Sequence, residues 1–77
     1  MHCVITFKTI HWVMKAEKIL KAQGIDITLI PTPREISSDC GMVIQVGCTE
    51  VNRAKDIINE QGLMIEGVYQ LEKGYAD

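Results

Sequence analysis

The sequence predicts an α+β fold in which four strands form one antiparallel sheet and two helices cover one of its faces. Two observations support this fold class. Short runs of apolar and β-branched residues recur four times in the 77 residues, and runs of this length are typical of strands. Between them lie two amphipathic stretches with apolar residues at helical spacing, and each stretch ends at a glycine.

The chain begins with a predicted strand and a predicted helix. Residues 3–7 are mostly β-branched or aromatic, which favours an extended strand. Thr9 is a suitable N-cap for a helix that we expect over residues 10–23, and Gly24 is its expected C-cap. The apolar residues spaced three and four apart should form the buried stripe of this helix: Ile10, Val13, Met14, Ala16, Ile19 and Leu20.

Two further strands flank a long polar loop. We expect a strand over residues 25–30 that ends at Pro31, because proline cannot donate a ladder hydrogen bond, and another strand over residues 42–46. Loops as long as this one are uncommon in small domains and are usually functional or disordered. Pro31 and Pro33 restrict the backbone, which favours an ordered, functional loop.

The last third of the chain contains a second helix and a fourth strand. Thr49 is the predicted N-cap of a helix that runs to about Gln61, and Gly62 ends it. Its expected buried stripe consists of Val51, Ala54, Ile57 and Ile58. Residues 63–71 form the predicted fourth strand, with a bulge at Gly67, since glycine inside a strand often marks one.

The resulting order, strand-helix-strand-strand-helix-strand, is the ferredoxin-like βαββαβ arrangement. We therefore predict a single domain over residues 1–77 with the strand order 4-1-3-2. The sheet face without helices should carry alternate side chains, namely Val4, Thr6, Val43, Gln45 and Val68. That face is expected either to be solvated or to pair with a second copy of the chain as a homodimer.

Composition and charge exclude several classes of protein. The net charge is −2 and no run of Lys or Arg is present, so we expect no nucleic-acid partner. No apolar run reaches the roughly 18 residues that span a bilayer, and residues 1–4 lead directly into a strand-like run, so we expect neither membrane insertion nor a signal peptide. Three cysteines cannot form a complete disulfide framework, which predicts unpaired thiols and a cytoplasmic location.

The predicted topology brings several reactive residue types to one edge of the sheet. Gathered there should be Lys8, Thr9, His11, residues 31–34, Cys40 and Gly41, with residues 61–64 at the rim. Amide donors and the positive end of a helix stabilise an anion, so they would favour the thiolate of Cys40, and Lys8, Arg34 or His11 could add positive charge. Gly41 would allow close backbone approach or an unusual dihedral. Alternatively, Cys40 is a small buried residue, and Arg34 and His11 are solvated.

The other two cysteines are predicted to lie at the opposite edge. Cys48 is the main competitor for reactivity, because it precedes a helix cap, whereas Cys3 alternates with Ile5 and Phe7 and is expected in the core. A Cys3–Cys48 disulfide, or a metal site that also uses His2, is geometrically conceivable. No pair of ligands has the spacing typical of zinc sites, so we predict neither a metal nor another cofactor.

The segment Ile30-Pro31-Thr32-Pro33-Arg34-Glu35-Ile36-Ser37-Ser38-Asp39-Cys40-Gly41 resembles the P-x-P-R-x-I-S-x-x-C-G signature of the selenium/sulfur (Se/S) carrier protein-like family of small bacterial proteins. The resemblance covers nearly the whole chain. It implies a carrier, rather than a stand-alone enzyme, whose Cys40 holds sulfur or selenium as a persulfide or selenosulfide. Its partners would be donor and acceptor proteins. A lowered thiol pKa would make such a cysteine both a better nucleophile at neutral pH and a better leaving group.

Two other classes of function fit the same sequence. One is a non-catalytic, ferredoxin-like interaction module that pairs through its open sheet face, in which Cys40 has no role. The other is a small-ligand regulatory module, since this fold supports many unrelated functions.

Overall fold

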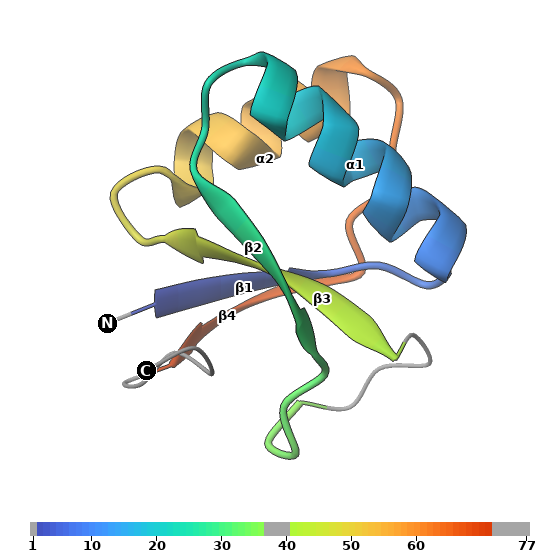
Figure 1. The fold of residues 1–77 in the computed structure, drawn as a ribbon, viewed down its shortest axis with the longest axis vertical. Helices are drawn as coiled ribbons and strands as arrows, with labels where there is room; N and C mark the ends of the chain where they lie inside the picture. The colour runs from blue at the N-terminus through green and yellow to red at the C-terminus, as the bar shows by residue number, and fades with distance from the viewer. Residues whose placement is uncertain (1, 37–40, 72–77) are drawn as a thin grey trace.

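The fold is a four-stranded antiparallel sheet with both helices on one face (Figure 1). The computed structural model describes residues 2–36 and 41–71. Its elements are β1 (His2–Thr6), α1 (Ile10–Ala22), β2 (Ile27–Pro31), β3 (Met42–Gly47), α2 (Val51–Glu60) and β4 (Gly67–Leu71). The strand order is β2-β3-β1-β4, which is the predicted order 4-1-3-2 written in the opposite direction. The α+β, ferredoxin-like prediction is therefore confirmed.

The register of the sheet decides which side chains face the helices. Cys3, Ile5 and Phe7 belong to the core cluster on the helix side, whereas Val4 belongs to a separate cluster on the opposite face. Ile5 pairs with Val68, so Val68 lies on the helix side, and its predicted place on the other face is wrong. Cross-strand partners share a face, and an offset of one residue moves every side chain of a strand to the other side.

The larger core lies between the sheet and the helices. Its fully buried members include Ile5, Phe7, Val13, Leu20 and Ile44. The predicted stripe of α1 is only partly correct, because Ile10 and Met14 are 48% and 52% exposed. Val13, Ala16 and Leu20 form the centre of the buried face, and Ile10 and Met14 lie at its solvent flank.

The ends of the helices depend on a few local contacts. Thr9 caps α1 as predicted, since the backbone N–H of Trp12 donates to Thr9 Oγ1 at 3.3 Å. Gly24 follows α1 with a φ of +79°, a conformation that glycine adopts without a steric cost. The predicted cap of α2 at Thr49 is wrong, because Glu50 occupies the cap position and no side chain caps the helix. Instead, the Glu50 N–H donates to the Gly47 carbonyl at 2.9 Å and closes a tight turn.

β4 is shorter than predicted, and it contains no bulge at Gly67. It begins at Gly67, which pairs with Thr6 in an uninterrupted register. Residues 63–66 connect α2 to the sheet, and Leu63 is buried in the core. A Cβ atom on Gly67 would lie 3.0 Å from Tyr69 Cε1, so glycine here leaves room for the Tyr69 ring.

The sheet face opposite the helices is covered in part by the segment that follows β2. Ile36 packs against Val4, Ile30 and Val43, and Leu71 packs against the same cluster. Thr6 and Gln45 on this face are also buried within the single chain. The face therefore offers little free apolar area at these positions for a second copy to bury. Among the described residues, no helix is long and apolar enough to cross a membrane.

Candidate functional site

β1 and β2 end, and β3 begins, on the same side of the sheet. We call each of the two sides at which strands begin or end an edge of the sheet. Pro31 pairs with Met42, and the next residues are joined by a hydrogen bond from the Thr32 N–H to the Gly41 carbonyl at 3.1 Å. The loop between β2 and β3 is therefore closed at its base. Gly41 is described and exposed. Cys40, the predicted reactive cysteine, lies outside the described residues.

The first part of this loop alternates between buried and exposed side chains. Pro33 and Ile36 are buried, and the Ile36 N–H donates to the Pro33 carbonyl at 3.1 Å, which makes a turn. Arg34 and Glu35 lie between them and are exposed. The anchoring role of Ile36 was missed from the sequence, although a single isoleucine in a polar loop was a usable signal.

Gly41 has open space around its Cα atom. Among the described residues, nothing lies within 4 Å of the position that a Cβ atom would take. The expectation that Gly41 allows a close backbone approach therefore finds no such neighbour among the described residues, and its role stays a prediction. The free space in front of its Cα faces solvent, since the residue is exposed.

Lys8 and Thr9 line a hollow at the N-terminal end of α1. This hollow has a volume of about 270 Å³, and its other lining residues are Trp12, Met64, Ile65 and Glu66. The α2–β4 connection reaches this edge, as predicted from its place at the rim. The Thr9 hydroxyl caps α1, which gives this residue a structural role.

His11 is separated from this hollow. It lines a second hollow of about 280 Å³ on the outer face of α1, together with Met14, Lys15 and Lys18. The described members of the predicted cluster lie at one edge, but Lys8 and His11 border different surfaces of α1.

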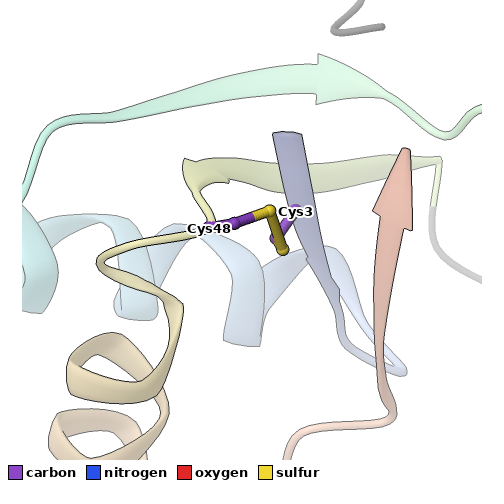
Figure 2. Close-up of a disulfide and its surroundings, with 2 residues drawn as sticks. All are labelled: Cys3 and Cys48. Atoms are coloured by element: carbon purple, nitrogen blue, oxygen red, sulfur yellow. A yellow bond between two sulfur atoms is a disulfide. The ribbon is translucent and has the colours of Figure 1, made fainter. Parts of the chain in front are cut away.

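The opposite edge of the sheet holds a disulfide between Cys3 and Cys48, whose Cα atoms are 5.2 Å apart. Figure 2 shows the bond joining β1 to the turn that leads into α2. The two residues meet because His2 pairs with Gly47, so the chain passes from Gly47 to Cys48 beside the start of β1. The prediction of unpaired thiols is therefore wrong for these two cysteines, and it no longer supports a reducing compartment.

The disulfide also bears on the expectations for Cys48 and for the conceivable metal site. Cys48 is bonded and so is not a competing free thiol. Among the described residues, no group of three His, Cys, Asp or Glu side chains could hold a metal ion. The conceivable metal site with His2 would use the sulfur atoms of Cys3 and Cys48, and these are bonded to each other.

β3 separates the two edges. It contains six residues, so at about 3.3 Å per residue the disulfide lies roughly 20 Å from the base of the loop. The two edges are chemically independent within one chain, because thiol–disulfide exchange requires direct contact between sulfur atoms.

Comparison with known proteins identifies the family of the chain. Neither the curated proteins nor the solved structures gave a match to this chain. A family described as "Putative Se/S carrier protein-like" matches residues 2–70, which include both helices, nearly the whole sheet and the loop between β2 and β3. Because this match spans most of its length, the chain belongs to the Se/S carrier protein-like family.

Proposed function

We propose that the protein carries sulfur or selenium on Cys40, as a persulfide or a selenosulfide. The observation that supports this most directly is the pairing of the other two cysteines. The chain has three cysteines, and Cys3 and Cys48 are bonded to each other. No other cysteine of the same chain is left for Cys40, so its thiol is available for chemistry with a partner.

The loading step needs no cofactor. The Cys40 thiolate attacks the outer sulfur of a donor protein's protonated persulfide, and a new S–S bond forms at Cys40. The S–S bond of the donor breaks, the donor cysteine leaves as a thiolate, and the proton stays on the transferred sulfur. No net oxidation occurs. A selenium atom in place of the outer sulfur follows the same course, and transfer to an acceptor reverses it.

The loop supports a carrier role because its flanks are fixed. Pro33 and Ile36 hold one side, and the hydrogen bond between Thr32 and Gly41 closes the base. Fixed flanks lower the entropy that is lost when a partner binds the loop. Arg34 is exposed on the same segment and is suited to contact an anionic persulfide or a partner's carboxylate.

Gly41, Lys8, Thr9 and His11 have different parts in the proposal. The open space at Gly41 would let a partner's backbone approach the residue beside Cys40. Lys8 is exposed at the same edge and would add positive charge there, whereas Thr9 acts indirectly by capping α1. His11 lies on the outer face of α1 and would contact the partner rather than the chalcogen.

The experiment is persulfide loading by a cysteine desulfurase with free cysteine, followed by intact-mass spectrometry. The wild-type chain should gain one sulfur atom that a thiol reductant removes. Cys40→Ser should gain none, and the matched double variant Cys3→Ala/Cys48→Ala should load as the wild type does. Loading of Cys40→Ser would show that the carrier thiol has been assigned wrongly.

A small-ligand regulatory module is the second candidate. The observation that favours it is the hollow of about 270 Å³ at the start of α1, whose lining includes Trp12, Met64 and Ile65. Apolar lining with a few polar groups is typical of small-molecule sites. A ligand in this hollow should change the fluorescence of Trp12, which is the single tryptophan of the chain.

The location of the protein is part of the proposal. A carrier that exchanges persulfides with partners needs a reduced Cys40, which is consistent with the cytoplasm. Alkylation of thiols before cell lysis would test this, because it reports which of the three cysteines carry a free thiol in the cell. Alkylation of Cys40 would show the reduced thiol that the proposal needs, and an oxidised Cys40 would contradict it.

A further inference from the structure

The outer face of α1 carries a row of basic residues. His11, Lys15 and Lys18 are spaced four and three residues apart, which places them on one side of the helix. All three are exposed, and together with Met14 they line the hollow of about 280 Å³. This face points away from the sheet, because Val13, Ala16 and Leu20 occupy the buried side.

Positive charge is concentrated on this part of the chain. Residues 8–21 contain four lysines and one glutamate, a net charge of +3, in a chain whose net charge is −2. The remaining residues therefore total −5. Such a separation of charge creates a local positive field on a protein that is acidic overall.

Most of these cations are not neutralised within the described chain. Lys21 pairs with Glu17 at 3.2 Å, but Lys8, Lys15 and Lys18 form no ion pair with any described residue. Lys15 and Lys18 are therefore available to a partner. Surface cations contribute more to the rate and specificity of association than to the stability of the fold.

Apolar side chains border the charged row. Ile10 and Met14 are 48% and 52% exposed, and they lie one turn apart on the same flank of α1. Exposed apolar residues next to charges are typical of protein–protein interfaces, in which an apolar centre is surrounded by polar contacts. A nucleic acid would gain little from Ile10 and Met14, and the acidic remainder of the chain would repel it.

We propose that the outer face of α1 is a docking surface for a protein that presents carboxylates around an apolar side chain. Its charge and exposed area are complementary to such a patch. α1 begins at the sheet edge where the loop between β2 and β3 starts and ends. The identification of this partner as the sulfur donor or acceptor rests on the proposed function. The binding of a partner with carboxylates to α1 does not.

The test uses isotope-labelled Cys40→Ser protein, so that failure of the carrier chemistry cannot affect it. The probe is a soluble peptide of glutamates with leucine at every fourth position. Its addition should shift the amide resonances of residues 10–18 in the NMR spectrum, and raised salt should weaken the binding. Lys15→Glu/Lys18→Glu should lower the affinity by about ten-fold.

The matched control is Arg53→Glu/Lys55→Glu, which makes the same change in net charge on α2. It should leave the affinity within about two-fold, because both residues lie outside the α1 row. If both double variants lowered the affinity for the peptide equally, net charge alone would explain the effect, and the proposal would be overturned. An unperturbed α1 would also overturn it, as would tighter binding of a DNA duplex or of anionic lipid vesicles to the same residues.

Discussion

The two ends of β3 are held in different ways. At its C-terminal end a short turn leads to Cys48, and a covalent bond to Cys3 fixes the chain. At its N-terminal end a long loop is held by a hydrogen bond at its base and by two buried side chains, Pro33 and Ile36. The comparison shows a division of labour among the cysteines. Cys3 and Cys48 are bonded to each other at one edge, whereas Cys40 precedes Gly41 of the other edge in the sequence.

The largest expected effect comes from removal of the covalent link. Cys3→Ala/Cys48→Ala opens a closed chain segment with a sequence separation of 45 residues. We expect the free energy of unfolding to fall by about 4 kcal/mol, because the unfolded chain gains conformational entropy. Urea unfolding of the wild-type protein, with and without a reductant, provides the control. An unchanged midpoint in both experiments would mean that this bond does not stabilise the fold.

The next largest effect is expected at the edge that carries the loop between β2 and β3. Ile36→Ala removes a buried side chain that packs on Val4, Ile30 and Val43, and it should lower the free energy of unfolding by about 3 kcal/mol. Persulfide loading should slow as well, because the loop loses an anchor. Met64→Ala is the matched control, since Met64 is 73% exposed and its truncation should cost less than about 0.5 kcal/mol. If both variants were equally stable, Ile36 would not be an anchor.

A smaller effect concerns the caps of the two helices. Thr9→Ala should destabilise the protein by about 1 kcal/mol, because it removes the acceptor for the Trp12 N–H. Thr49→Ala should change the stability by less than about 0.5 kcal/mol, since Thr49 caps nothing and is exposed. Thermal unfolding of the two variants side by side measures the difference, and the reverse ranking would contradict the assignment of the caps.

The smallest effect on stability is expected at Gly41. Gly41→Ala places a methyl group where no described residue lies within 4 Å, so the free energy of unfolding should change by less than about 0.5 kcal/mol. Transfer of sulfur to or from a partner should nevertheless slow, if the open space serves the partner's approach. Gly67→Ala provides the contrast, because its new Cβ would meet Tyr69 at 3.0 Å and should disturb folding rather than transfer.

Local signals in the sequence were sufficient for much of the fold. Thr9 and Gly24 mark the two ends of α1 chemically, and the order of the elements determined the sheet topology. Two of the errors arose where an answer depends on the register of the sheet. Whether Val68 faces the helices is decided by its pairing with Ile5, and whether Cys3 meets Cys48 is decided by the pairing of His2 with Gly47. Alternation within a strand cannot supply either pairing.

The candidate site was predictable to a different extent. The shared edge of Lys8, Thr9 and Gly41 followed from topology alone, and it was confirmed. The separation of His11 from Lys8 depends on the rotation of α1 about its axis, which is set by packing against the sheet. The role of Cys40 rests on the family signature and on the pairing of the other cysteines, and it stays a prediction.

The burial of Ile36 bears on protein engineering. This loop buries a side chain against the sheet face opposite the helices, so it cannot be moved to another protein without that face. A graft of residues 31–41 onto another sheet of the same topology would need a recipient surface shaped like that of Val4, Ile30 and Val43. A designed chalcogen carrier would therefore have to copy two strand faces along with the loop.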